Sequence, residues 1–178
     1  MVDLQLIGVL VTAASATIAM VFYILNLRET ARNRRVTLTT TLMQRFMTIE
    51  GMKHFYELYS MEWSSLDDYR SKYDSRVNPD NFAKRMSMWN LCDSLGQLYR
   101  EDMIDLKTLR GGAGNVIQYM WIKFKPVIEM YRGTDFSPVV YQNFEYVAEK
   151  LIELERQMGD SEAGKRPERV IQEHFNLQ

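Results

Sequence analysis

The sequence predicts an all-α fold in which one N-terminal transmembrane helix continues into a cytoplasmic helical bundle. No charged residue occurs from Leu6 to Leu25, and this run has about the length that a helix needs to cross a bilayer. After Gly51 the chain carries repeated signals for the start and end of helices, and it shows little of the alternating apolar pattern that strands require.

Length and composition narrow the class of protein. The 178 residues fit one globular domain plus a membrane segment. The formal net charge of −1 argues against a DNA-binding protein, because the chain lacks a general basic field. Cys92 is the single cysteine, so an intrachain disulfide is impossible and a reducing compartment is expected. We expect no cofactor and no metal site.

We divide the chain into four segments. Residues 1–27 form the transmembrane anchor. Residues 28–60 form a juxtamembrane helix that continues the span, because no Pro or Gly interrupts the chain between Met20 and Glu50. Residues 61–158 form the cytoplasmic helical bundle, and residues 159–178 form a polar linker followed by a short C-terminal helix.

The apolar run is expected to stay in the chain. Ala14-Ser15-Ala16 resembles the cleavage site of a signal peptide, but the basic region that should precede the apolar run is missing and apolar sequence continues past the site.

The charges that flank the apolar run orient it. Asp3 is the only charged residue before the run, whereas Glu29 and four arginines follow it: Arg28, Arg32, Arg34 and Arg35. The positive-inside rule therefore predicts a single-pass protein of the cell membrane with its N-terminus outside and its large domain in the cytoplasm. These arginines are also placed to reach lipid phosphates, so membrane lipids are expected partners.

Small and polar residues collect on one face of the span. They recur at steps of three and four as far as Ala19 and again two helical turns later, and we call this set the packing face: Gln5, Gly8, Thr12, Ser15, Ala19 and Asn26. A second stripe, from Leu4 through Ile7, Val11 and Ala14 to Leu25, is apolar. Small residues let helix backbones approach closely, so the first stripe predicts self-association or a contact in a larger membrane complex, and the second predicts a lipid face. In a large ring the packing face could line a pore. The alternative is that its hydroxyls bond only to their own helix.

Several helix boundaries are predicted beyond the anchor. Ser64 and Asp68 have the spacing of a capping box, Asn78-Pro79 places a cap before a helical proline, and Asp105 can cap the next segment. Pro126 is expected to bend or end a helix, and Ser137-Pro138 is expected to start another.

Two patterns that invite a chemical interpretation are better explained structurally. The run Gly111-Gly112-Ala113-Gly114 lacks the Lys-Ser/Thr ending of a phosphate-binding loop and follows no strand, so it predicts a helix break or a close helix crossing. Glu50 and His54 lie one helical turn apart and could share a cation, but a pair of this kind is more typical of a solvated helix surface.

A third pattern supports an alternative function. Arg169 and His174, separated by four residues, match in outline the motif of HEPN-type ribonucleases, in which paired helical subunits act on an RNA phosphate. Val170 replaces the polar residue that usually follows the arginine. This alternative makes the chain a membrane-anchored ribonuclease or a CRISPR-associated membrane-pore accessory protein, and only then is RNA a partner.

Three segments carry a resemblance to a known family. They run from Asn26 to Arg35, from Val77 to Asn90 and from Met120 to Pro126. In these segments the chain resembles an uncharacterised prokaryotic, largely archaeal, family of N-terminally anchored helical proteins, and the resemblance extends to about Met158. It implies architecture and source, and it carries no catalytic residues. We therefore expect a non-catalytic membrane protein that oligomerises and acts as a scaffold, a pore or an accessory subunit.

Overall fold

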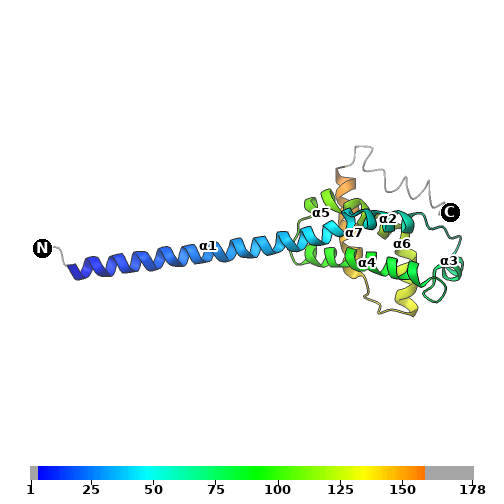
Figure 1. Ribbon diagram of the computed structural model, residues 1–178, viewed down its shortest axis with the longest axis horizontal. Helices are drawn as coiled ribbons and strands as arrows, with labels where there is room; N and C mark the ends of the chain where they lie inside the picture. The colour runs from blue at the N-terminus through cyan, green and yellow to red at the C-terminus, as the bar shows by residue number, and fades with distance from the viewer. Residues whose placement is uncertain (1–3, 159–178) are drawn as a thin grey trace. The chain divides into compact units, whose positions relative to one another are not determined.

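The computed structural model describes residues 4–158 and consists of helices (Figure 1). No strand occurs among these residues, so the predicted all-α class is confirmed. Seven helices follow one another along the described chain: α1 Leu4–Met47, α2 Ile49–Tyr59, α3 Leu66–Tyr73, α4 Pro79–Arg100, α5 Leu106–Gly112, α6 Gly114–Thr134 and α7 Gln142–Gln157.

The chain divides into two compact units. The N-terminal unit ends at Leu38 and the helical unit begins at Thr39. Among the described residues, α1 is the helix that is long and apolar enough to cross a membrane. Its most apolar stretch of 18 residues has a mean hydropathy of 2.1, and none of these residues is buried. The expected apolar helix is therefore present.

The last turns of α1 belong to the helical unit. Thr39, Met43 and Phe46 are buried there, and the helix ends at Met47. Thr48 then caps α2 through its Oγ1, which accepts a hydrogen bond of 2.9 Å from the backbone N–H of Gly51. The segment 28–60 that the sequence suggests as one juxtamembrane helix thus contains the end of α1 and all of α2, because Thr48 caps a new helix after Met47.

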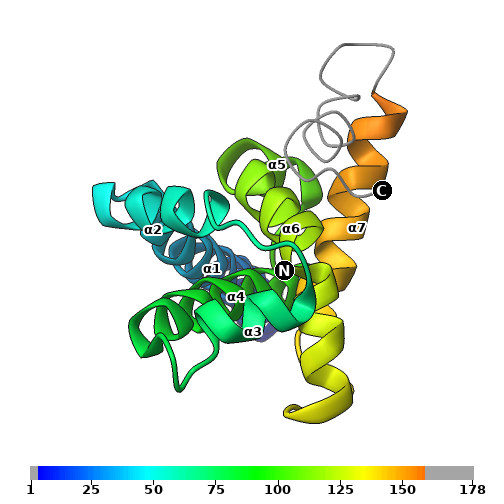
Figure 2. The same cartoon turned by 90° about the vertical axis from the view of Figure 1, so that its right-hand side faces the viewer.

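Helices α4, α6 and α7 hold the core of the helical unit (Figure 2). The ring of Trp89 meets that of Phe124 edge to face at 5.5 Å, and the ring of Trp121 meets that of Phe144 in the same way at 5.3 Å. All four side chains are at most 2 % exposed. Edge-to-face packing of this kind adds to the free energy gained by burying the rings.

Helix α7 begins four residues later than the sequence predicts. Ser137-Pro138 lies in a turn, and Tyr141 adopts a left-handed conformation with φ of 58° immediately before the first helical residue. The cap comes from another helix: Asp93 Oδ1 on α4 accepts hydrogen bonds from the backbone N–H groups of Asn143, at 3.0 Å, and Phe144, at 2.9 Å. The expected start was wrong because a tertiary contact replaced the local signal.

Gly96 lets α4 and α7 approach each other at this point. A Cβ atom on Gly96 would lie 2.1 Å from the backbone oxygen of Asn143, a distance that a side chain cannot occupy. The glycine and the carboxylate of Asp93 therefore position the start of α7 on α4 together.

The other predicted boundaries agree with the structure in most details. Asn78 caps α4 and Pro79 is its first residue, as expected. Asp105 caps α5. Ser65 rather than Ser64 caps α3, while Asp68 Oδ2 accepts a hydrogen bond from the backbone N–H of Ser64 at 2.9 Å.

The glycine run and the proline affect the helices differently. The run 111–114 produces the predicted helix break, at Ala113 between α5 and α6. Pro126 does not end its helix, because α6 continues through it to Thr134.

Candidate functional site

The predicted packing face lies on the exposed surface of α1. All six of its residues are exposed, and a helix with about 100° between successive residues brings them within an arc of about 80°. Their order along the helix is Gln5, Gly8, Thr12, Ser15, Ala19 and Asn26. A Cβ atom on Gly8 would meet nothing within 4 Å, so the backbone is open to a neighbouring helix at this position.

The hydroxyl of Thr12 is already bonded within the helix. Its Oγ1 donates to the backbone oxygen of Gly8 at 2.8 Å, and Thr17 Oγ1 donates to the oxygen of Ala13 at 2.9 Å. These bonds satisfy the donors of both threonines, as the alternative interpretation expects. The oxygen of Thr12 can still accept a hydrogen bond. In a helix contact this residue can therefore pack closely and accept a hydrogen bond from the neighbouring helix, but its hydroxyl hydrogen is already used.

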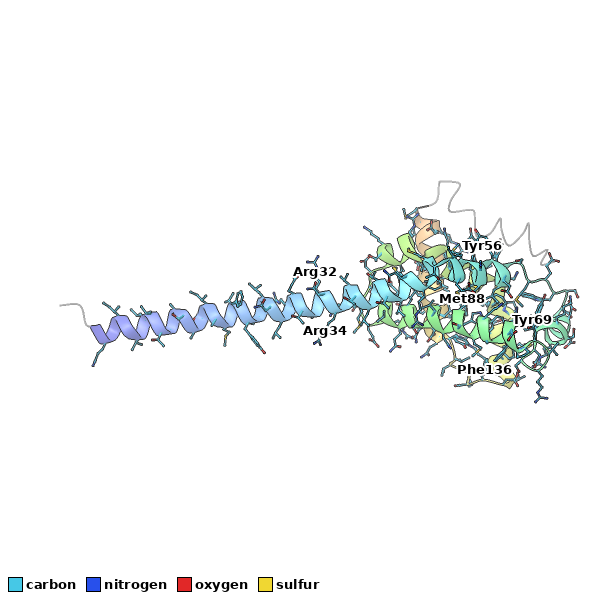
Figure 3. All side chains as sticks on the ribbon, in the orientation of Figure 1. Arg32, Arg34, Tyr56, Tyr69, Met88 and Phe136 are labelled. Carbon is cyan, nitrogen blue, oxygen red and sulfur yellow. The ribbon has the colours of Figure 1, made fainter. Side chains whose placement is uncertain are left out.

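The four predicted headgroup arginines are all exposed on α1. Helical geometry places Arg28, Arg32 and Arg35 within an arc of about 60°. Arg34 projects from another side of the helix than Arg32, as Figure 3 shows. The structure thus brings three of the four arginines together and separates the fourth from them.

The helical unit has a half-open groove of about 310 Å³ between the end of α1, α2 and α4. Its apolar lining comes from Leu42, Met88 and Leu91, and neutral polar side chains come from Ser87, Asn90 and Ser94. Basic side chains complete the lining, together with Gly51: Arg45, His54 and Lys84. The groove therefore combines a few apolar side chains with groups that can hold polar or anionic atoms.

Two of the basic side chains of the groove lie close to carboxylates. Lys84 Nζ lies 2.8 Å from a carboxylate oxygen of Glu57, and His54 Nε2 lies 3.1 Å from Glu50 Oε1. The second pair is the one-turn spacing noted in the sequence, and its glutamate side chain is 70 % exposed. Among the residues that the structure describes, no three His, Cys, Asp or Glu side chains come together as a metal site would require.

Sequence reasoning missed a buried cation, Arg85 on α4. The residue is fully buried, and its guanidinium lies over the rings of Tyr69 at 5.0 Å and Trp89 at 5.8 Å. It donates to Asn81 Oδ1 at 2.5 Å and to the backbone oxygen of Tyr73 at 3.0 Å. Burial lowers the pKa of this group and raises that of the Tyr69 phenol. The helical spacing of Arg85 from Phe82 and Trp89 places it on an apolar face of α4, but the sequence does not identify the groups that surround it there.

Lys123 on α6 is a second buried cation, only 4 % exposed. Its Nζ donates to the backbone oxygens of Tyr59 and, at 2.6 Å, Met61, which lie in the last turn of α2 and just after its end. The ammonium also lies 5.2 Å from the centre of the Trp63 ring. Burial lowers the pKa of Lys123 to about 8. Through these hydrogen bonds Lys123 links the C-terminal end of α2 to α6. Its position in the sequence does not reveal this structural role.

Arg169 and His174, the residues of the alternative ribonuclease motif, lie outside the described residues. That alternative stays a prediction.

The family comparison covers both units. A model described as Domain of unknown function (DUF4760) matches residues 10–151, from within the apolar part of α1 into α7. The chain belongs to this family. No curated protein and no solved structure matches it. The match confirms that the chain belongs to an uncharacterised family, as the resemblance predicted. The archaeal source stays a prediction.

Proposed function

We propose that this DUF4760 protein is a single-pass protein of the cell membrane that self-associates through its span. It presents the helical unit in the cytoplasm as a scaffold or as an accessory subunit of a membrane complex. The observation that carries the proposal is a contrast between the two units. The residues in the most apolar part of α1 are not buried, whereas the helical unit buries its own apolar core.

Water is an unfavourable solvent for the surface of α1. From Ile7 to Leu27 its large apolar side chains are between 43 % and 69 % exposed. Moving one such side chain from water into an apolar environment stabilises it by about 1.5–3 kcal/mol. An exposed series of this length therefore favours hydrocarbon as the surroundings of the helix.

The arginines support the proposed orientation. Arg28, Arg32, Arg34 and Arg35 follow the apolar run, and their exposed guanidinium groups suit contact with anionic headgroups on the cytoplasmic side. The family match supports a joint role for both units, because one family model extends from the anchor into α7.

Self-association is tested by two matched substitutions in the span. Ala19→Leu adds a bulky side chain to the packing face, whereas Ala14→Leu adds the same side chain to the apolar stripe. Energy transfer between labelled copies in mild detergent should fall for Ala19→Leu and stay at the wild-type level for Ala14→Leu. Equal values for the two variants would contradict a specific packing face, and a strictly monomeric wild type would contradict self-association.

The composition of the purified complex tests the proposed role. An accessory subunit should copurify in a fixed ratio with other chains, and a scaffold should form small oligomers of its own. A closed ring with conductance in planar bilayers would instead assign a pore, with Gln5, Thr12, Ser15 and Asn26 towards the channel. Protease protection in inverted vesicles checks the orientation, because only a cytoplasmic helical unit is digested there.

A further inference from the structure

The packing face does not end where the span ends. Four uncharged residues continue it along the N-terminal unit, namely Asn26, Thr30, Asn33 and Thr37, and all four are exposed. At about 100° per residue they lie within an arc of about 60°, and none of the charged residues between positions 28 and 35 falls inside that arc. We call these four residues the polar seam.

Two opposite charges flank the polar seam. Glu29 lies about 70° to one side of its centre and Arg34 about 70° to the other side. Residues at this spacing on one helix do not face each other, so the two groups cannot pair within the chain. Among the described residues, neither Glu29 nor Arg34 forms an ion pair.

The seam has the residue spacing of a parallel two-stranded contact, with polar residues at its central positions. Thr30 and Thr37 occupy one type of central heptad position, and Asn26 and Asn33 occupy the other. Glu29 then precedes the first central threonine, and Arg34 follows Asn33, five residues after Glu29. These are the flanking positions at which opposite charges of two parallel helices meet across the contact.

We infer that two copies of this chain pack their α1 helices in parallel along the polar seam, with Glu29 of each copy paired with Arg34 of the other. The inference rests on the proposed function, because copies inserted in the membrane with one orientation are necessarily parallel. It extends their contact beyond the span, to Thr37.

A second copy fits this surface because the seam is complementary to itself. In a parallel pair each central residue meets its own counterpart, so a charge in the seam would meet a like charge, and the seam has none. Asn33 can donate and accept, so two copies of it can bond to each other. Thr37 donates its hydroxyl to the backbone oxygen of Asn33 at 2.9 Å, and its oxygen stays able to accept.

A charge-reversal cycle in the full-length chain tests the pairing. Glu29→Arg places two arginines opposite each other across the contact, and Arg34→Glu places two glutamates opposite each other. Each single variant should weaken the dimer by about three- to tenfold, whereas the double variant should regain wild-type affinity. Energy transfer between labelled copies in mild detergent measures the dissociation constant. In about 1 M salt the effect of the single variants should shrink, because ions screen exposed charges.

The outcomes separate this inference from the proposed function. If both single variants and the double variant associate like the wild type while Ala19→Leu still weakens the dimer, the span associates and the inferred seam contact is wrong. A wild type that is monomeric, or that joins only other proteins, overturns both. Single variants that weaken the dimer without recovery in the double variant also overturn the pairing, because recovery is its specific signature.

Crosslinking in native membranes gives an independent measure. Thr37→Cys should form a disulfide between copies under mild oxidation, whereas Ala31→Cys, about 120° away on the same helix, should not. Cys92 is fully buried, so the wild type serves as the blank. Equal crosslinking of the two cysteine variants would contradict a defined contact face.

Discussion

The two units of this protein use apolar residues in opposite ways. In the helical unit, apolar side chains such as Trp89, Phe124 and Phe144 are covered by other helices of the same chain. In the N-terminal unit, side chains of similar hydrophobicity, such as Ile18 and Phe22, are 69 % and 65 % exposed. The same chemistry thus drives internal packing in one unit and leaves apolar surface exposed in the other.

This difference makes the two units separable in experiment. The helical unit should respond to changes that disturb its close packing, and the N-terminal unit should respond to changes in surface polarity. All three tryptophans, Trp63, Trp89 and Trp121, lie in the helical unit, so their fluorescence reports on its unfolding alone. Retention in carbonate-washed membranes reports on the anchor.

The largest expected effect concerns the anchor. Val11→Arg combined with Ile18→Arg should make membrane insertion less favourable by about 5–7 kcal/mol, because each arginine at the centre of a span costs about 2.5–3.5 kcal/mol. The double variant should leave the membrane pellet after carbonate washing, with unchanged tryptophan fluorescence. Val36→Arg with Leu38→Arg is the control, since these exposed residues follow the arginines, and this variant should stay in the pellet.

The second effect concerns the contact between α4 and α7. Gly96→Ala should lower the free energy of unfolding of the helical unit by about 3 kcal/mol, because the new Cβ would collide with the backbone of Asn143. Urea unfolding followed by tryptophan fluorescence measures the change. Gly111→Ala is the matched control: its Cβ meets nothing within 4 Å, so a helix-favouring alanine should be neutral or stabilising there. A loss of membrane retention in Gly96→Ala would argue against the separation of the two units.

The third effect depends on pH and concerns Lys123. Its pKa is about 8 in the folded protein, whereas an exposed lysine in the unfolded chain has its ordinary pKa of about 10.5. Between these values the unfolded chain binds more protons, so the contribution of Lys123 to stability rises with pH. From pH 7.5 to pH 10, the unfolding free energy of the wild type should therefore rise by about 2 kcal/mol relative to that of Lys123→Met.

The comparison of wild type with Lys123→Met cancels the titration of other groups, such as Cys92, whose pKa is raised by burial. A difference that stays constant across this pH range would show that Lys123 titrates as an exposed lysine. Membrane retention should not change with pH in either protein, because no Asp, Glu, His, Lys or Arg occurs from Leu6 to Leu25.

The smallest effect concerns the cap of α7. Asp93→Ala should cost the helical unit about 1–2 kcal/mol, because the backbone N–H groups of Asn143 and Phe144 lose their acceptor. Asp67→Ala removes an exposed acidic side chain from the first turn of α3 and should change the unfolding free energy by less than about 0.5 kcal/mol. Equal values for the two variants would show that Asp93 does not cap α7.

Local signals predicted what local chemistry controls. Asn78 and Asp105 cap helices as their sequence contexts indicate, because a cap needs only a side-chain oxygen and the next few backbone N–H groups. The break at Ala113 follows from its glycine neighbours in the same way. The packing face and the arginines could also be placed on a helix from spacing alone, since α1 is regular from Leu4 to Met47.

Contacts between distant segments were not predictable in this manner. Ser137-Pro138 has the local pattern of a helix start, yet α7 begins after Tyr141, where Asp93 from α4 supplies the cap. Arg85 and Lys123 look like surface residues by type, but aromatic rings and backbone carbonyls from other helices surround them. Their burial depends on which helices meet, and a single sequence does not specify this.

The sequence by itself determined the helical class, the apolar run, its charged flank and most caps, because each depends on residues within a few turns of one helix. Only the tertiary structure decided that the last turns of α1 join the helical unit, and that Gly96 and Asp93 hold α7 on α4. It also decided that Lys123 ties the end of α2 to α6. These features depend on surfaces that meet after folding, where burial and close approach set the free energy.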